Sequence, residues 1–224
     1  MHDNVSQCLA AWGGQYGWSE NGDEWKGQAV ACGVSYEAWK ESLIRNLIAP
    51  HVNGRSVVLE IAPGHGRWTE YLAASAAHVT AVDISAACLD YCRNRFQDQS
   101  NVDYFLTTGD RLPRAATGQI DFVWSYDSFV HIHRDLIRGY MGEIRRVLSP
   151  GGEAIIHHSN IDDIEGHEQK GSAGWRSAMN IELMRIFARE TDLTVMSHFT
   201  YWDEERKIGV PRFGDRITHL RRSS

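Results

Sequence analysis

The sequence predicts an α/β fold built around a doubly wound, mostly parallel sheet. An apolar run that starts at Ser56 ends on Glu60 and turns through Gly64 and Gly66 into a helical stretch. A second apolar run follows one helix later and also ends on an acid, Asp83. A strand, a glycine turn and a helix, followed by a strand that ends on a carboxylate, are typical of sheets that bind nucleotides.

Two classes of ligand use a site of this kind, and the residues around the glycines separate them. Glycine lets the backbone turn tightly beside a ligand, and the start of the next helix offers unpaired N–H groups. Dinucleotide folds need a third glycine, but Thr69 stands at that position. Glu60 precedes the turn and would repel a pyrophosphate, so it favours a cationic ligand.

The ordered motifs of the chain resemble those of the class I S-adenosylmethionine-dependent methyltransferases. The motifs are Glu60 to Gly66, Asp83, Gly109-Asp110 and Pro150-Gly151-Gly152. They cover about residues 55 to 160, and Ala62 stands where the family more often has its first glycine. The resemblance implies a three-layer α/β/α, Rossmann-like methyltransferase fold with a seven-stranded, mostly parallel sheet. Two strand-like runs after position 193 fit the C-terminal antiparallel hairpin of that family.

We expect residues 1–224 to form a single methyltransferase domain, because this length suits one α/β domain of ordinary size. The expected parts are an aromatic-rich N-terminal lid and helix at 1–50, a cofactor-binding core at 55–160, a substrate loop at 161–176, and a C-terminal helix and hairpin at 177–224. Helical periodicity from Tyr36 to Ala49, ended by Pro50, places the helix of the first part.

The resemblance implies S-adenosyl-L-methionine as the cofactor and S-adenosyl-L-homocysteine as its product. Glu60 would bound the amino-acid end of the cofactor, Asp83 would hold its ribose, and Asp110 its adenine. A plain Asx turn is the alternative explanation of Asp110. The other expected cofactor-binding residues are Ala62, Pro63, Gly64, Gly66, Trp68, Ile84, Gly109, Ser125 and Tyr126.

The stretch after the fourth strand carries the candidate base. A strand is expected at 120–125, and ligands of an open parallel sheet sit beyond the carboxyl ends of its strands. Asp127 and His131 are four residues apart and share one face if the chain turns into a helix there. Asp127 would then orient His131 and raise its basicity. This stretch is similar to that of sugar O-methyltransferases, which have a histidine at a similar place; the alternative is a histidine that only packs beneath a helix start.

His157 and His158 end the fifth strand, and either is a further catalytic candidate. Side chains alternate along a strand, so only one of the two can point to a given face. The pair suggests a second acid or base, or ligands for a divalent ion together with Asp127. We expect no metal, because the ligands have no recognisable spacing and histidine is a poor ligand for magnesium.

Aromatic and charged residues outside the core are candidates for substrate binding. The segment 1–40 holds four of the eight tryptophans, so we expect it to fold back as a lid over the site or as a plug that only covers the core. The loop at 161–176 ends in Trp175 and Arg176. The Trp175 ring could stack on a sugar and the Arg176 guanidinium could bind an anion, although simple surface packing explains both residues equally well. The expected substrate-binding residues are Tyr16, Trp18, Asn160, Trp175 and Arg176.

Composition and charge limit the partners. A net charge of −6 argues against a polyanion such as nucleic acid. No apolar run approaches the roughly twenty residues of a membrane helix, and the start lacks a secretory pattern, so we expect a cytoplasmic protein without a membrane span. The four cysteines are expected as core thiols. A monomer and a homodimer both remain open.

The expected function is methylation of a hydroxyl on a sugar or another small hydroxylated metabolite. Methyl transfer is a one-step displacement that needs alignment and, for a hydroxyl, a base. His131 would be that base, assisted by His157 or His158. N-methylation of a small amine held by aromatic rings is the nearer alternative. A nicotinamide-dependent oxidoreductase and a non-catalytic cofactor-binding scaffold are the others.

Overall fold

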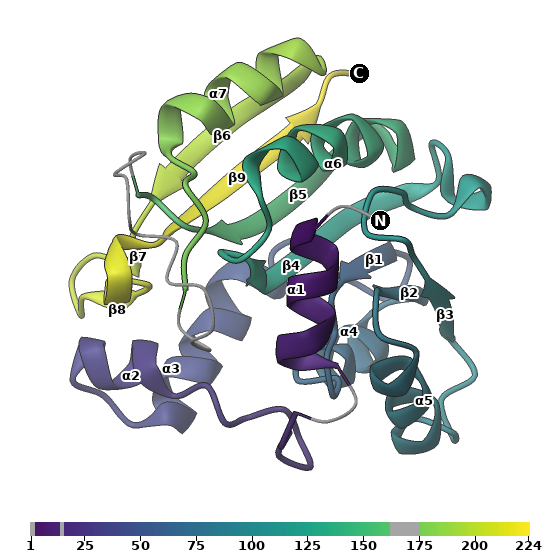
Figure 1. Ribbon diagram of the computed structural model, residues 1–224, viewed down its shortest axis with the longest axis horizontal. Helices are drawn as coiled ribbons and strands as arrows, with labels where there is room; N and C mark the ends of the chain where they lie inside the picture. The colour runs from purple at the N-terminus through teal and green to yellow at the C-terminus, as the bar shows by residue number, and fades with distance from the viewer. Residues whose placement is uncertain (1–2, 14–15, 162–174) are drawn as a thin grey trace.

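A seven-stranded sheet forms the centre of the computed structural model, which describes residues 3–13, 16–161 and 175–224 (Figure 1). Its strands are β1 (Val57–Ile61), β2 (His78–Asp83), β3 (Val102–Leu106), β4 (Ile120–Phe129), β5 (Leu148–His158), β6 (Leu193–Phe199) and β9 (Arg216–Arg222). A separate two-stranded ribbon consists of β7 (Tyr201–Asp203) and β8 (Ile208–Gly209).

The order of strands across the sheet is β3-β2-β1-β4-β5-β9-β6. The first five strands of the chain pair in parallel, whereas β9 runs antiparallel to both β5 and β6. The order reverses between β1 and β4, which is the switch point where open α/β sheets bind ligands. The expected fold class is confirmed, including the C-terminal antiparallel hairpin formed by β6 and β9.

Helices surround the sheet and connect its strands. They are α1 (Asp3–Trp12), α2 (Gly27–Cys32), α3 (Tyr36–Leu43), α4 (Thr69–Ser75), α5 (Ala86–Arg95), α6 (Arg134–Val147) and α7 (Ile181–Glu190). Helix α3 continues into a π-helical segment, Ile44–Ile48, which together match the helix expected before Pro50. Single turns of 3-10 helix lie at Arg114–Ala116 and Arg212–Gly214. Within the described ranges, no helix has the length and apolar character required to cross a membrane.

Alternation of side chains along β4 divides the core into two layers. Phe122 and Trp124 pack with α3 and α4 on one face of the sheet, whereas Val123 packs with α6 and α7 on the other. Helix α6 buries one stripe of its surface, made of Ile137, Tyr140, Met141, Ile144 and Val147. Burial of each such side chain contributes about 1.5–3 kcal/mol to the stability of the fold. The two layers together therefore hold the sheet and the ends of its strands in place.

Strand β4 is longer than the sequence indicated. It continues beyond Ser125 to Phe129, where it pairs with His158 of β5. Asp127 lies inside this extension with a φ of 62°, a value that a helix does not allow. The expected helix carrying both Asp127 and His131 is therefore wrong, and His131 lies in the turn that leads to α6.

Candidate functional site

A cavity of about 440 Å³ lies at the carboxyl ends of β1, β2 and β4. Helix α1 crosses in front of these strands (Figure 1), and its residues Cys8 and Trp12 line the cavity. The side chain of Asn4 fixes the helix, because it donates to the carbonyl oxygen of His131 (3.1 Å) and accepts from the N–H of His133 (2.8 Å). The volume is in the range of cavities that hold cofactors.

Asp83 ends β2 and holds the glycine loop after β1. Its carboxylate accepts hydrogen bonds from the backbone N–H of Gly64 (3.3 Å) and of Ser85 (2.8 Å). Asp83 is buried, and burial raises its pKa to about 6. The expected residues Ala62, Pro63, Gly64 and Ile84 line the same part of the cavity. These expected residues therefore lie together at one end of the cavity, and their binding of the cofactor stays a prediction.

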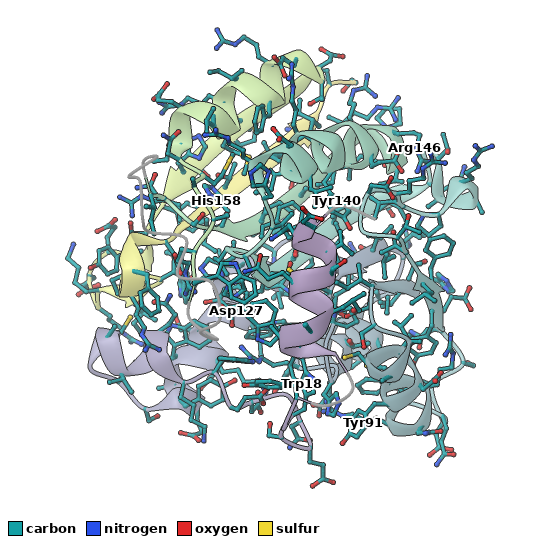
Figure 2. All side chains as sticks on the ribbon, viewed as in Figure 1. Trp18, Tyr91, Asp127, Tyr140, Arg146 and His158 are labelled. Carbon is teal, nitrogen blue, oxygen red and sulfur yellow. The ribbon has the colours of Figure 1, made fainter. Side chains whose placement is uncertain are left out.

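The indole ring of Trp18 lies over Gly64, which has a φ of 57°. A Cβ atom at Gly64 would come within 2.8 Å of that ring, so the contact requires glycine. Trp18 also stacks on His65, with 5.2 Å between ring centroids, and His65 stacks on Tyr91 at 3.6 Å. Trp18 lines the cavity beneath the end of α1 (Figure 2). The N-terminal segment therefore closes directly onto the glycine loop.

Glu60 and Ser125 lie behind the cavity wall rather than among its lining residues. The Glu60 carboxylate accepts a hydrogen bond of 2.6 Å from the hydroxyl of Thr69, and burial raises the pKa of Glu60 to about 7. The Ser125 hydroxyl donates to the carbonyl oxygen of Ile61 at 3.1 Å. Both side chains brace the ends of β1 and β4 beneath the glycine loop.

Gly66, Gly109 and Asp110 also lie outside the lining of the cavity. Gly66 has a φ of 83°, and a Cβ there would stand 2.5 Å from the ring of Phe96. Gly109, with a φ of 90°, approaches Val5 of α1, where a Cβ would stand 2.7 Å away. Asp110 is exposed. The two glycines permit close packing, and the role of Asp110 toward the adenine stays a prediction.

His131 lies on the cavity wall, and its two ring nitrogens differ. Nδ1 is 2.6 Å from the carbonyl oxygen of Trp175, and because a carbonyl only accepts, Nδ1 carries the proton. Nε2 is therefore the unprotonated nitrogen. The ring lies 4.2 Å from that of Trp12 between centroids. Burial lowers the pKa of His131 to about 3, so the imidazole is neutral near pH 7.

A row of ionisable side chains runs behind the next part of the wall, where Arg67, Asp127 and Arg176 line the cavity and His157 and Asp215 lie outside its lining. Nη1 of Arg67 donates to the Asp127 carboxylate at 3.1 Å, and Asp127 Oδ1 lies 3.3 Å from Nδ1 of His157. Nε2 of His157 lies 3.3 Å from the carboxylate of Asp215, which accepts from Nε of Arg176 at 3.0 Å. Nδ1 of His157 also accepts from the backbone N–H of Asp127 at 3.2 Å. Burial lowers the pKa of His157, but the two nearby carboxylates outweigh burial and raise it.

Asp127 belongs to this row and also lines the cavity (Figure 2). Burial raises the pKa of Asp127, but the hydrogen bond to His157 and the charge of Arg67 together hold it well below its usual range. Asp127 is therefore ionised at any pH where the protein works, and a carboxylate of such low pKa is a weak base. Its position instead suits stabilisation of positive charge inside the cavity.

His157 and His158 point to opposite faces of β5, as the alternation of a strand requires. Nδ1 of His158 lies 2.6 Å from the carbonyl oxygen of Ser159, and Nε2 lies 2.7 Å from the hydroxyl of Thr218 on β9. Burial lowers the pKa of His158 to about 3. His158 packs between β5 and β9 outside the cavity lining, so its position gives no support to a catalytic role.

Trp68 and Tyr126 line the cavity as expected for the cofactor-binding residues. Their rings lie 5.5 Å apart, and Tyr126 stacks on His157 at 4.3 Å. The Tyr126 hydroxyl is buried and has no hydrogen-bond partner among the described residues. Burial raises the pKa of Tyr126, so this hydroxyl stays protonated. A buried donor without a partner is a group that a ligand can satisfy.

The expected substrate residues near the N-terminal segment occupy one side of the cavity. Trp18 and Arg176 line it directly. The ring of Tyr16 lies 5.0 Å from that of Trp18 and stacks on Trp25 at 5.6 Å, so Tyr16 supports the lining.

Trp175 and Asn160 do not line the cavity. Trp175 is buried, and its carbonyl oxygen orients His131. Oδ1 of Asn160 accepts from the N–H of Ile181 at 3.2 Å, which fixes the start of α7. Most of the expected substrate loop, residues 162–174, lies outside the described residues.

Several residues of the site were not expected from the sequence. They are Cys8, Leu9, Lys26, Arg67, Tyr140, Arg212 and Phe213, which line the cavity, and Asp215 behind it. Arg67 follows the second glycine directly, but nothing in the sequence signals that an arginine there is buried. Asp215 precedes β9, and only the pairing of β9 with β5 brings it to His157.

One group of side chains among the described residues could hold a metal ion, namely His51, Glu153 and His219. Nδ1 of His51 lies 2.7 Å and Nε2 of His219 lies 3.3 Å from Oε2 of Glu153. None of the three lines the cavity. The alternative ion site of Asp127 with His157 and His158 does not form, because the two histidines diverge.

Residues 58–152 match the family model described as a methyltransferase domain. The chain is 32% identical over 100 residues to demethylmenaquinone methyltransferase of Tropheryma whipplei (strain Twist), a stretch that is 44% of this chain and 40% of that protein. It is 27% identical over 104 residues to ubiquinone biosynthesis O-methyltransferase of Aromatoleum aromaticum (strain DSM 19018 / LMG 30748 / EbN1), covering 46% of this chain and 44% of the relative. The matches therefore span less than half the length of these curated relatives.

Solved methyltransferases share the fold over most of the chain. An S-adenosylmethionine-dependent methyltransferase from Clostridium acetobutylicum superimposes with a TM-score of 0.64 at 15% identity, covering 89% of this chain and 96% of that one. The N-methyltransferase NodS from Bradyrhizobium japonicum, solved with S-adenosyl-L-homocysteine, gives a TM-score of 0.60 at 16% identity, covering 84% and 87%.

Residues 58–152 are thus similar to a methyltransferase domain, and the described residues share the fold of solved methyltransferases. Nothing in these comparisons supports the nicotinamide-dependent oxidoreductase.

Proposed function

We propose that the protein transfers the methyl group of S-adenosylmethionine to a hydroxyl of a small metabolite, such as a sugar or another hydroxylated acceptor. The proposal rests on the position and the tautomer of His131. Its Nδ1 proton is fixed by the carbonyl oxygen of Trp175, which leaves Nε2 unprotonated on a wall of the cavity. A hydroxyl must lose its proton as the new bond forms, and a positioned imidazole is the side chain most often used for that step.

The residues at the β1 and β2 end of the cavity fit the cofactor. The buried carboxylate of Asp83 is an acceptor for ribose hydroxyls, and the buried Tyr126 hydroxyl is a donor without a partner among the described residues. When bound, S-adenosylmethionine supplies a methyl group on a positively charged sulfonium. The ionised Asp127 on the same cavity stabilises positive charge there.

The surroundings of His131 make it a weak base before the cofactor binds. Burial and the charge of Arg176 lower its pKa to about 3, and the Trp175 carbonyl, Asp127 and Asp215 raise it by less. Methyl transfer would remove one positive charge from the cavity, and a proton taken up by His131 would replace it. Asp127 on the cavity wall would then interact with an imidazolium in place of the cationic cofactor, and this change favours the proton transfer.

Two of the relatives support a small-molecule acceptor, and one of them supports methylation at oxygen. One relative is an O-methyltransferase of ubiquinone biosynthesis and another acts in the methylation of demethylmenaquinone. N-methylation of a small amine is the second candidate function. It is favoured by the indole rings of Trp12, Trp18 and Trp25 on the cavity, because aromatic faces attract a cationic amine.

We further propose that residues 1–50 comprise an aromatic-rich lid and a packed helix, that 161–176 selects the substrate, and that 55–160 binds the cofactor within a single domain. The lid is supported by α1 and Trp18, which lie over the cavity and the glycine loop. A small-molecule partner, rather than nucleic acid, fits the net charge of −6.

Two measurements test the function in sequence. Isothermal titration of the purified protein with S-adenosylhomocysteine should show binding at one site per chain. A screen of hydroxylated and amine acceptors, read by release of S-adenosylhomocysteine, should then give turnover with a hydroxylated compound. Absence of cofactor binding would remove the methyltransferase proposal, and turnover confined to amines would replace hydroxyl methylation by the second candidate.

A further inference from the structure

Basic side chains line the cavity together with the carboxylates of Glu24, Asp83 and Asp127, and two of the basic side chains have no carboxylate partner among the described residues. Four basic side chains line the cavity, namely Lys26, Arg67, Arg176 and Arg212. Arg67 is neutralised by Asp127 at 3.1 Å and Arg176 by Asp215 at 3.0 Å. Neither Lys26 nor Arg212 has a carboxylate within 4.0 Å among the described residues. The cavity therefore presents two uncompensated cations.

The turn that carries Arg212 is held in place by buried contacts. Gln28 of α2 accepts from the backbone N–H of Arg212 at 2.9 Å and donates to its carbonyl oxygen at 3.4 Å. The same side-chain amide donates to the buried carboxylate of Asp215 at 3.3 Å. The guanidinium of Arg212 fills the space beside Gly27, where a Cβ would come within 1.7 Å of Nη1. The fold thus places the Arg212 guanidinium beside Gly27, the residue that follows Lys26 in the chain.

Phe213 occupies a strained position between two of the arginines. It has a φ of 63°, which costs a residue with a bulky side chain on the order of 1 kcal/mol or more. Its ring lies 4.2 Å from the guanidinium carbon of Arg176 and 4.5 Å from that of Arg212. The ring is 45% exposed, so an apolar face stands beside the cations at the mouth of the cavity.

The topology assigns these residues to the acceptor end of the cavity. The cofactor end is built on β1 and β2, through Gly64 and Asp83. Arg212 precedes β9, which is separated from β1 by β4 and β5. Three strand spacings correspond to about 14 Å across the sheet. Asp127 lies near the end of β4 and His131 follows that strand, so both lie between the two ends of the cavity.

We infer that the methyl acceptor carries an anionic group, a carboxylate or a phosphate, and that Arg212 and Lys26 bind it. This inference rests on the proposed function, because it takes the cavity to hold cofactor and acceptor together. Guanidinium and ammonium groups without their own carboxylates are the side chains that recognise such anions. The ring of Phe213 would cover the apolar part of the acceptor beside its charge. The carboxylate of the cofactor itself shares this chemistry, so the experiment separates the two sources.

The test compares matched charged and neutral probes on protein saturated with S-adenosylhomocysteine. The probes are inorganic phosphate, and 4-hydroxybenzoate against 4-hydroxybenzamide, which differ chiefly in charge. The variants are Arg212→Met, Lys26→Met and the double variant, with Arg212→Lys to restore the charge. Lys207→Met is the control, because Lys207 is exposed, pairs with Glu204 at 2.8 Å and lies away from the cavity.

We expect phosphate to bind the loaded wild type and 4-hydroxybenzoate to bind about tenfold tighter than the amide. The double variant should lose this preference, Arg212→Lys should retain part of it, and Lys207→Met should keep it. Affinity for S-adenosylhomocysteine should stay within about twofold in all variants.

Three results would overturn the inference. In the first, the wild type binds the two aromatic probes with equal affinity and does not bind phosphate. In the second, the double variant keeps the preference for 4-hydroxybenzoate, and in the third the variants lose affinity only for S-adenosylhomocysteine. The last would assign the cations to the carboxylate of the cofactor. Failure of the wild type to bind S-adenosylhomocysteine would be a different outcome, because it removes the proposed function itself.

Discussion

Nδ1 of His131 donates to the carbonyl oxygen of Trp175 over 2.6 Å. The two residues come from different parts of the chain, the turn after β4 and the segment that leads to α7. The bond selects the tautomer in which Nε2 holds the lone pair. A base on this wall of the cavity therefore depends on a backbone atom 44 positions away, and not on the nearby Asp127 as the sequence suggested.

Replacement of His131 by glutamine should lower turnover with a hydroxyl acceptor by about a hundredfold or more, because the base is lost. Affinity for S-adenosylhomocysteine should change by less than about threefold, since Asp83 and the glycine loop are untouched. Steady-state release of S-adenosylhomocysteine and isothermal titration measure the two quantities. Unchanged turnover in His131→Gln with normal cofactor affinity would end the assignment of this base.

Asp83→Asn should weaken binding of S-adenosylhomocysteine by roughly ten- to a hundredfold, because a charged acceptor of the ribose hydroxyls becomes a neutral amide. Asp103→Asn is the matched control, since Asp103 lies on the neighbouring strand β3 with 78% of its side chain exposed. Titration calorimetry on both variants gives the comparison. Equal affinities in the two variants would remove Asp83 from the cofactor site.

Asp215→Asn should lower the free energy of unfolding by about 3 kcal/mol, because it leaves Arg176 and His157 without a fully buried carboxylate. Asp203→Asn should cost less than about 0.5 kcal/mol, since Asp203 lies 3.9 Å from an exposed Arg206 on the surface. Urea denaturation monitored by circular dichroism measures both values. A loss in Asp215→Asn no larger than in the control would show that the buried row of ionisable side chains contributes nothing.

Gly64→Ala should destabilise the protein more than Gly118→Ala. Both glycines have positive φ, 57° and 66°, so both variants share the backbone cost of about 1 kcal/mol. A Cβ at Gly118 meets no atom within 4 Å, whereas at Gly64 it meets Trp18 at 2.8 Å. The excess loss in Gly64→Ala measures that contact. Equal losses would mean that Trp18 moves aside without cost and does not hold the N-terminal segment.

His158→Gln should reduce the dependence of stability on pH. Burial lowers the folded pKa of His158 from 6.5 to about 3, so between these values the unfolded state binds more protons. Its contribution is fully present above pH 6.5 and is lost as the pH falls. The slope of unfolding free energy between about pH 4 and 6 should fall by about 1.4 kcal/mol per pH unit in the variant. The other buried groups, Asp83, Glu60 and His131, are shared by both proteins and cancel in the difference.

Stability profiles of wild type and His158→Gln that run parallel would show that His158 is protonated in the folded protein. His78→Gln serves as the control for a histidine substitution, because His78 is partly exposed on β2.

The alternation of strands, glycine turns and helices made the fold predictable, because those patterns are local. The contact between Gly64 and Asp83 was predictable for the same reason, because Gly64 follows and Asp83 ends a strand whose apolar run is plain in the sequence. The other side of the cavity was not predictable. Arg67, Asp215 and Arg212 come from separate segments, and only tertiary packing joins them to Asp127 and His157.

Two expectations concerned the geometry of the histidines, and the structure agrees with only one of them. Alternation along β5 correctly separated His157 from His158, but it could not state which one contacts Asp127 and Asp215. The expected helix at Asp127 and His131 was wrong, because pairing of β4 with β5 extends the strand to Phe129. Pairing with the neighbouring strand β5 thus decides the backbone conformation at Asp127, which the spacing of Asp127 and His131 alone could not indicate.

The pairing of β5 with β9 affects the surroundings of the two adjacent histidines of β5. His157 opposes Ile217 and His158 opposes Arg216 in the antiparallel ladder. A slip of β9 by one position along that ladder would displace Asp215, which directly precedes β9, from His157. Asp127 would keep its contact, because it lies on β4 and β4 pairs separately with β5. The backbone register between β5 and β9 thus decides whether His157 has one carboxylate neighbour or two.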